Sequence, residues 1–187
     1  MEKTLEQQPS DCLKVVLFGP ESTGKTTLAE QLSEHYNCPL VPEYMRIYLQ
    51  KKWDEQGLKV EKHDLLPIAE GQMELENKAA QQGDDLLICD TNLREIKVYS
   101  EYYYGGFCPE PIIRSLNHSE YDLYLLTYID TPWVADDLRD RPDDRLHIFR
   151  TFENELKRNA LPHGVIRGSE SQRLTLAIEL IDKLRRR

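Results

Sequence analysis

Eight residues near the start of the chain combine two glycines, a lysine and hydroxyl side chains at a spacing that binds phosphate. The segment 19–26 reads Gly-Pro-Glu-Ser-Thr-Gly-Lys-Thr, which fits the phosphate-loop pattern of Gly, four residues, Gly, Lys and then Ser or Thr. The glycines let the backbone approach phosphate oxygens, and successive N–H groups then point at the anion. The lysine of this pattern reaches the β- and γ-phosphates, and the final hydroxyl is a ligand for Mg²⁺. We therefore expect ATP and Mg²⁺ as cofactors, bound by Gly19, Glu21, Ser22, Thr23, Gly24, Lys25, Thr26 and Thr27, with Lys25 catalytic and Thr26 a metal ligand.

The segments on both sides of this loop favour the same interpretation. Residues 14–18 are typical of a buried strand, and residues 25 to about 36 have helical spacing with Leu28 and Leu32 on one face. A strand, the loop and a helix are the context that the motif requires. The alternative is a glycine-rich turn that binds nothing, and the flanking elements argue against it.

Two acidic residues follow expected strands and could act on a bound phosphate. Asp90 comes directly after the apolar run 86–89, the usual context for an acid that orients Mg²⁺. Glu43 follows the apolar segment 39–41, where a carboxylate could deprotonate and align the hydroxyl of an acceptor. A helix cap is the alternative for Asp90, and an exposed loop position is the alternative for Glu43. Arg46 could hold substrate or phosphate or lie on the surface, and the sequence leaves open which acid takes the proton.

Three arginines occur in a polar segment beyond the fourth expected strand. Small kinases often carry a mobile lid in this position, whose guanidinium groups neutralise charge on the transferring phosphoryl group. Closure of such a lid also excludes water. The many aspartates between 136 and 144 support a solvated, charged loop as the alternative. The candidate lid arginines are Arg139, Arg141 and Arg145.

Aromatic residues near these segments could bind a flat ring. Trp133 lies just beyond the fourth expected strand and could stack on a base or a pyridine ring, or simply pack against its neighbours. Four tyrosines lie close together at 99, 102, 103 and 104. We expect these tyrosines to pack along a helix rather than to line a ring-binding site.

Strand-like and helix-like segments alternate along the chain, which predicts a parallel sheet of about five strands with helices on both faces. We expect an α/β fold of the P-loop NTPase and kinase type, in which ligands lie beyond the carboxyl ends of the strands. The expected organisation is a flexible tail over 1–11 and one domain over 12–187. Expected strands cover 14–18, 39–41, 86–89, 121–129 and 165–166, and expected helices cover 25–36, 47–56, 65–81, 93–104, 110–118, 145–159 and 170–187.

The composition limits the classes of partner. The formal net charge of -9 argues against binding to a nucleic-acid backbone, which needs a basic face. The longest apolar runs are the length of strands, so we expect no membrane insertion. The four cysteines form no CxxC pair, which favours reduced thiols and a cytoplasmic location.

Four segments in this order resemble the ribosylnicotinamide kinase domain of NadR-type proteins of NAD metabolism. They are the phosphate loop with the following Thr-Leu over 19–28, Glu43-Tyr44 with Arg46, Asp90-Thr91, and Thr-Pro-Trp-Val-Ala-Asp over 131–136. The last of these is the specific part, because many families share the phosphate loop. The resemblance spans roughly residues 14–184 and implies ATP-dependent phosphorylation of the 5′-hydroxyl of nicotinamide riboside, giving nicotinamide mononucleotide. The riboside would then contact Glu43, Tyr44, Arg46, Asn92, Trp133 and Asp136.

The chain departs from the family pattern at one position, because the family often has glycine where this sequence has Asp137. Longer NadR proteins also carry an adenylyltransferase domain, and we expect only the kinase step here. Two other functions stay open: a kinase for another nucleoside or metabolite, and a nucleotide-dependent regulatory ATPase without a small acceptor. An Asn-Lys-x-Asp motif that reads guanine is not found after any expected strand, which argues against a GTPase. The sequence leaves the acceptor and the oligomeric state open.

Overall fold

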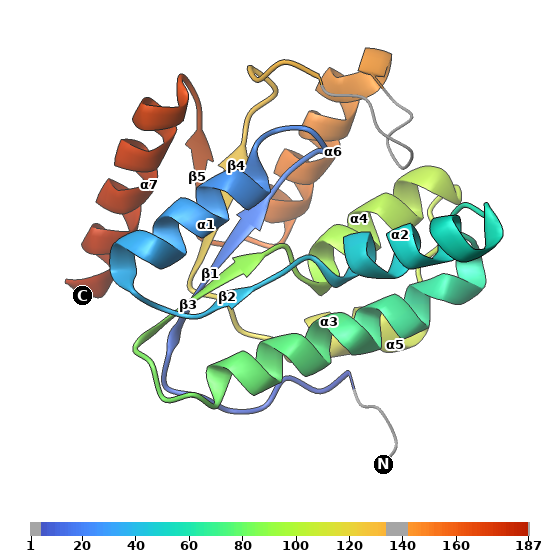
Figure 1. The fold of residues 1–187 in the computed structure, drawn as a ribbon, viewed down its shortest axis with the longest axis horizontal. Coiled ribbons are helices and arrows are strands. Elements are labelled where there is room, and N and C mark those ends of the chain that lie inside the picture. Colours follow the sequence, from blue (N-terminus) through green and yellow to red (C-terminus); the bar gives the residue numbers. More distant parts are fainter. Residues whose placement is uncertain (1–4, 134–141, 187) are drawn as a thin grey trace.

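The structure is a computed structural model that describes residues 5–133 and 142–186. The described residues form one five-stranded sheet in the order β2-β3-β1-β4-β5 (Figure 1). Every neighbouring pair of strands is parallel. The expected α/β fold with a five-stranded parallel sheet is therefore confirmed. The strands are β1 (Leu13–Phe18), β2 (Leu40–Val41), β3 (Leu86–Asp90), β4 (Leu123–Thr127) and β5 (His163–Ile166).

Helices cover the sheet on both sides, as Figure 1 shows with α1 and α7 on one side and α6 on the other. The connections between parallel strands are long enough to carry these helices across the sheet, as parallel pairing requires. Short 3₁₀ turns over Lys62–Asp64 and Pro142–Asp144 precede α3 and α6. The helices are α1 (Lys25–Tyr36), α2 (Tyr44–Gln56), α3 (Leu65–Ala80), α4 (Leu93–Tyr103), α5 (Glu110–Leu116), α6 (Arg145–Arg158) and α7 (Glu170–Arg185).

The position of β1 at the centre of the sheet explains why its residues 15–18 are continuously apolar. Residues 15–18 are completely buried, and alternate side chains face opposite sides of the sheet. Val15 and Leu17 belong to the core that α1 and α7 cover, together with Leu32 and Ile181. On the other face, Phe18 packs edge-to-face on Phe152 of α6 with ring centroids 4.7 Å apart.

Helices α2 to α5 build a second apolar cluster beside the sheet. Its buried members come from α3, α4 and α5, and half-buried side chains of α2 pack against it. A Cβ at Gly71 of α3 would lie 2.1 Å from the ring of Tyr44. Glycine is therefore required where α2 and α3 approach each other, and this approach sets the position of the first turn of α2.

Several boundaries differ from the expectation, including the start of β5 at His163 rather than at 165 and the end of α5 at Leu116 rather than at 118. Helix α2 begins at Tyr44 rather than at Ile47, so Tyr44 and Arg46 lie in its first turn. Strand β4 covers only Leu123–Thr127, although the backbone N–H groups of Asp122 and Tyr128 still donate to the carbonyls of Lys14 and Ile166 on the neighbouring strands.

The N-terminal residues make specific contacts with the domain. Residues 1–4 lie outside the described part, and the flexible tail expected over 1–11 stays a prediction. The Gln7 side chain donates a hydrogen bond to Glu76 Oε1 at 2.6 Å, and the Gln8 backbone N–H donates to Asn77 at 2.8 Å. Residues 7 and 8 are thus held against α3. Among the described residues, none of the helices combines the length and the apolar character that crossing a bilayer needs.

Candidate active site

The phosphate loop follows β1 at the carboxyl edge of the sheet. Gly24 adopts the left-handed conformation with φ 77° and caps α1 with its backbone. A Cβ at Gly19 would lie 2.7 Å from Thr127 Oγ1 at the end of β4, so the loop can touch the neighbouring strand only through glycine. The Thr23 hydroxyl bonds both the Pro20 carbonyl and the Thr127 hydroxyl at 2.7 Å. These contacts fix the conformation of the loop at the N-terminus of α1, where backbone N–H groups attract anions.

Two arginines support the loop from α6 and α7. The Arg173 side chain donates to the Thr23 carbonyl at 2.7 Å and pairs with Asp130. Arg145 donates to the carbonyls of Ser22 at 3.1 Å and Thr131 at 2.9 Å. Burial and the nearby Arg173 lower the pKa of Arg145. Sequence analysis missed Arg173, because it lies inside an ordinary amphipathic helix without a motif around it.

Lys25 is folded back onto its own loop. Its ammonium group donates to the carbonyls of Gly19 at 2.8 Å and Pro20 at 2.9 Å. Its Nζ atom also lies 3.4 Å from Oε1 of Glu95, and the side chains are 8% and 1% exposed. Burial alone lowers the pKa of Lys25, but the carboxylates of Glu95 and Glu43 outweigh it and raise the pKa.

Thr26 and Asp90 lie together, as the sequence predicts for a metal site. The Thr26 hydroxyl donates to Oδ2 of Asp90 at 2.6 Å. The other oxygen of Asp90 is buried without a hydrogen-bond partner among the described residues. Burial raises the pKa of Asp90, and the bond from Thr26 opposes this effect. A hydroxyl beside a carboxylate is a donor set that fits Mg²⁺. Asp90 does not cap α4, since Asn92 does so, and the helix-cap alternative is excluded.

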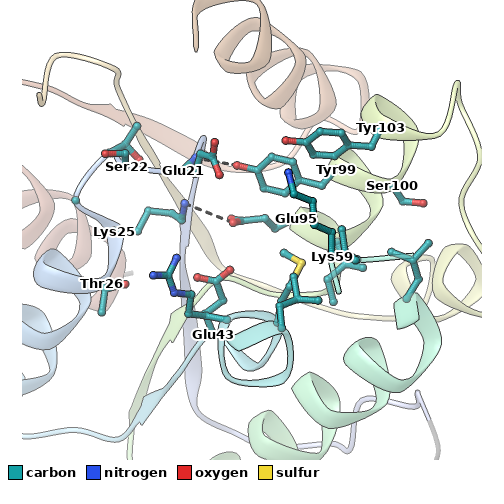
Figure 2. A pocket seen from close by; sticks show the side chains of 18 of the residues that line it. Glu21, Ser22, Lys25, Thr26, Glu43, Lys59, Glu95, Tyr99, Ser100 and Tyr103 are labelled. Carbon is teal, nitrogen blue, oxygen red and sulfur yellow. Dashed lines mark hydrogen bonds and ion pairs between the residues drawn. The ribbon is translucent and has the colours of Figure 1, made fainter. Parts of the chain in front are cut away.

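A cavity of about 410 Å³ joins the phosphate loop to the space between α2 and α4 (Figure 2). One end is formed by the phosphate loop, and Glu43, Arg46 and Glu95 line the space next to it. The far end is mainly apolar, with Ser100 and Lys59 as polar exceptions. The apolar lining consists of Met45, Leu49, Val60, Leu65 and Ile96.

Helix α4 supplies one wall of the cavity through residues spaced four apart. Glu95, Tyr99 and Tyr103 share one helical face, and Tyr104 joins them in the lining. Figure 2 shows Glu95 directed toward Lys25, and Tyr99 directed toward Glu21. The Tyr99 hydroxyl accepts the backbone N–H of Glu21 at 2.8 Å. Tyr99 and Tyr103 stack on each other with ring centroids 6.1 Å apart, and both line the cavity together with Tyr104. The expectation that these tyrosines do not bind a ring stays a prediction.

Glu95 is a site residue that sequence analysis missed. Burial raises the pKa of its carboxyl group to about 8, because the attraction of Lys25 only partly offsets the loss of solvent and Glu43 adds repulsion. The available signal was its place three residues after the helix cap Asn92. That spacing is also common in helices without any chemical role, so it carries no functional information by itself.

Two of the expected substrate contacts, Asn92 and Tyr44, have clear structural roles in the fold. Asn92 is completely buried, accepts the Arg94 backbone N–H at 3.1 Å and donates to the Tyr124 hydroxyl at 3.0 Å. It therefore begins α4 and positions Glu95, and its contact with substrate stays a prediction. The Tyr44 ring packs on Gly71 and does not belong to the cavity lining among the described residues.

The remaining expectations concern the segment after β4. The guanidinium of Arg145 lies 5.8 Å from the ring centroid of Trp133. Trp133 is not part of the cavity lining in the described part of the chain, so its contact with substrate stays a prediction. Asp136, Arg139 and Arg141 lie outside the described residues, and the lid with them.

Comparison with known families decides the classification. A family model described as an AAA domain (AAA_28) matches residues 14–173, most of the chain. The chain belongs to this AAA domain family. The match covers the phosphate loop at its start and Arg173 at its end.

The chain is also similar to NadR proteins, which confirms the resemblance to their kinase domain. It is 28% identical over 135 residues to the trifunctional NAD biosynthesis/regulator protein NadR of Escherichia coli K12. This alignment covers 72% of the chain and 32% of that protein, so the chain matches about a third of its curated relative. A NadR protein solved in complex with NR has a TM-score of 0.78 at 19% identity, over 93% of this chain and 52% of that one.

Complete small kinases share the fold as well. Thymidylate kinase from Ehrlichia chaffeensis matches with a TM-score of 0.62 and 21% identity, over 94% of this chain and 100% of that one. Deoxyadenosine kinase from M. mycoides matches with a TM-score of 0.63 and 14% identity, over 92% and 100%. At these identities the likeness concerns the fold, which is that of the P-loop kinases.

Proposed function

We propose that this chain is a kinase that transfers a phosphoryl group from ATP to the 5′-hydroxyl of nicotinamide riboside, giving nicotinamide mononucleotide. The observation that carries the proposal is the single cavity that connects the phosphate loop to an apolar, tyrosine-lined compartment. A nucleotide switch without an acceptor has no use for such a compartment. A kinase needs both halves to lie in one space, because the acceptor hydroxyl must meet the γ-phosphate.

The phosphate half would hold the nucleotide and activate it. The loop N–H groups and the N-terminus of α1 bind the phosphates, and Lys25 moves onto the β- and γ-phosphates. Thr26 and Asp90 would hold Mg²⁺, which neutralises charge on the transferring group when it is bound. Arg145 lies close to the loop through its bond to the Ser22 carbonyl, which places a further cation beside the phosphates.

The acceptor half would orient the riboside. Glu43 lies at the start of α2 and lines the cavity near Lys25, where it could accept the proton of the attacking hydroxyl. The faces of Tyr99, Tyr103 and Tyr104 suit a flat, positively charged pyridinium ring, which aromatic faces attract. The similarity to NadR, one of whose solved structures contains NR, supports this substrate.

A kinase for an ordinary nucleoside is the second candidate. The folds of deoxyadenosine kinase and thymidylate kinase match nearly all of this chain and all of those chains, whereas the chain covers half of the solved NadR protein. An aromatic and apolar compartment would also accept a base. The charge of the ring therefore decides between the two candidates. Tyrosine faces and carboxylates attract a positively charged pyridinium ring more strongly than a neutral base.

Acceptor-dependent release of ADP tests the proposal. The enzyme, Mg²⁺ and ATP are mixed separately with nicotinamide riboside, adenosine, uridine and thymidine, and the product is identified by mass spectrometry. We expect the highest kcat/KM for nicotinamide riboside, and no transfer by Lys25→Ala. Faster phosphorylation of a nucleoside would change the assigned acceptor but leave the kinase activity standing. ATP turnover that no acceptor changes would overturn the kinase itself.

A further inference from the structure

Glu95 is a buried carboxyl group whose contacts fit only one state of the enzyme. Its Oε1 atom lies 3.4 Å from Lys25 Nζ. Its Oε2 atom is buried and has no partner in good hydrogen-bond geometry among the described residues, although the Thr91 hydroxyl is near enough to lower the pKa of the carboxyl group and the side chain lines the cavity. A buried oxygen left without a partner is costly, so it indicates a group that is completed by something else.

Lys25 has no free donor in this arrangement. An ammonium group has three N–H donors, and the three contacts of Lys25 are the carbonyls of Gly19 and Pro20 and the carboxyl of Glu95. Binding a nucleotide phosphate through Lys25 therefore requires that it leave some of these partners. The contact with Glu95, at 3.4 Å, is longer than the two contacts with carbonyls at 2.8 and 2.9 Å. A phosphate oxygen can take the place of this carboxylate as the negative partner of Lys25, so this is the contact that a nucleotide would replace.

We propose that Glu95 binds a ribose hydroxyl of the acceptor once the nucleotide phosphate has drawn Lys25 away from it. The inference rests on the proposed function and adds a residue to it. Glu95 would thus exchange a cation for the ribose, whose two adjacent hydroxyl groups can give a partner to each of its oxygens in the complete complex. A hydroxyl can serve either form of the carboxyl group, because it both donates and accepts.

The helix that carries Glu95 holds it at the junction of the two halves. Asn92 caps α4 just before it, and Arg94 on the other side of the helix is tied to Glu155 of α6 at 2.8 Å. Figure 2 shows Glu95 between Lys25 and the side chain of Tyr99. A ribose whose base lies among the tyrosines would place its hydroxyls near this carboxyl group.

This exchange makes the binding of the two substrates cooperative. Without nucleotide, Lys25 occupies Glu95 and competes with the riboside. With nucleotide bound, Glu95 is available, and the riboside binds more tightly. By linkage, the riboside must strengthen nucleotide binding by the same factor.

The test measures the affinity of nicotinamide riboside by calorimetry, with and without a Mg²⁺ complex of an ATP analogue whose γ-phosphate cannot be transferred. For the unmodified protein we expect the analogue to tighten riboside binding at least about fivefold. Burial raises the pKa of Glu95 to about 8, so the comparison is made at about pH 8.5, where Glu95 is a carboxylate. In Glu95→Gln this ratio should fall to about one, because a neutral amide holds Lys25 weakly, and the analogue alone should bind more tightly than to the unmodified protein. Glu101→Gln is the matched control: Glu101 lies on the same helix and pairs with Lys97 at 3.0 Å outside the cavity lining, so the ratio should be retained.

The outcomes separate this inference from the function on which it rests. An unchanged ratio in Glu95→Gln, with riboside binding intact, would overturn the role of Glu95 and leave the kinase standing. No riboside binding to the unmodified protein would overturn the proposed acceptor and this inference together. Weaker binding of the analogue to folded Glu95→Gln would also contradict the exchange, because it would mean that Glu95 merely supports Lys25.

Discussion

Glu43 and Glu95 line the same cavity in different environments, and this difference separates their roles. Glu95 is 1% exposed, burial raises the pKa of its carboxyl group to about 8, and its Oε1 atom is already in contact with Lys25. Glu43 is only half-buried at the start of α2. Asp90, the other candidate base, is already bound to the Thr26 hydroxyl. We therefore assign the proton-accepting role to Glu43 as a proposal, because two carboxyl groups in unlike surroundings can hold different protonation states.

Replacement of Glu43 tests this assignment. Glu43→Gln keeps the size of the side chain but removes its basicity, so kcat should fall roughly 10²-fold or more with little change in ATP affinity. Steady-state kinetics and direct ADP binding would measure the two effects separately. The exposed Glu55, on the same helix and paired with Lys51, gives the control Glu55→Gln, which should be neutral. An unchanged kcat in Glu43→Gln would show that another group takes the proton.

The pKa of Glu95 also predicts a pH dependence of stability. Its folded-state pKa of about 8 lies above the ordinary value of 4.5, although Lys25 opposes this shift and Glu43 adds to it. The folded protein therefore binds a proton that the unfolded chain releases, and the stabilisation is full below the lower value and lost as pH rises through the higher one. Urea unfolding at about pH 5.5 and about pH 8.5 should show the unmodified protein losing stability relative to Glu95→Gln at the higher pH. A constant difference between the two proteins would contradict the raised pKa.

At the level of elements, α4 is the helix on which the candidate site depends. One face carries the cavity residues, and another is anchored by ion pairs from Arg94 at 2.8 Å and Lys97 at 2.9 Å to Glu155 of α6. The cap at Asn92 sets where the helix begins and therefore which side chains face the phosphate loop. A shift of one residue would turn Glu95 and Tyr99 by about 100° away from the cavity.

Removal of the buried ion pair between Arg94 of α4 and Glu155 of α6 should cost much more stability than removal of a more exposed ion pair within α6. Glu155→Ala leaves the buried Arg94 without its charged partner, and we expect a loss of about 3 kcal/mol in the free energy of unfolding. Glu153 also lies on α6 and pairs with the exposed Lys157, so Glu153→Ala should cost less than about 1 kcal/mol. Chemical unfolding of both variants measures the difference. Equal losses would mean that the pair to Arg94 does not anchor α4.

For the whole molecule, the parallel sheet decides where the site lies. The strands β1, β3 and β4 are adjacent and parallel, so the phosphate loop, Asp90 and Thr127 meet at one edge although they are far apart in the sequence. The register places Leu17 beside Asp90, which brings the candidate metal ligand next to the start of the loop. Ligand binding at this edge should therefore stabilise the entire domain.

Thermal and chemical unfolding with ADP tests this link between site and fold. At a ligand concentration of 100 times Kd, binding adds about 2.7 kcal/mol to the free energy of unfolding. We expect removal of Mg²⁺ with EDTA to abolish part of this gain, because Thr26 and Asp90 would hold the ion beside the phosphates. In Asp90→Asn the gain with ADP should become nearly independent of Mg²⁺. A gain that depends on Mg²⁺ to the same extent in this variant would exclude Asp90 as a ligand.

The sequence alone determined the parts of this protein whose physics is local. The phosphate loop is recognisable because its glycines, Lys25 and Thr26 act through backbone geometry within eight consecutive residues. The buried strands are recognisable because a sheet covered on both faces needs continuous apolar runs. The pairing of Thr26 with Asp90 followed from the order of strand, phosphate loop and helix, since the loop that leads to Thr26 follows β1 and Asp90 ends the neighbouring parallel strand β3.

The tertiary structure alone decided the rest of the site. Glu95, Tyr99 and Arg173 sit in ordinary helical sequence, and their roles depend on the direction in which each helix face points after packing. Asn92 has a side chain that could bind a substrate, but in the folded protein it is buried against the Tyr124 hydroxyl and caps α4. Which polar side chains meet a cavity is set by contacts between residues distant in the chain. A local pattern carries no record of those contacts, so the acceptor half became visible only in the folded molecule.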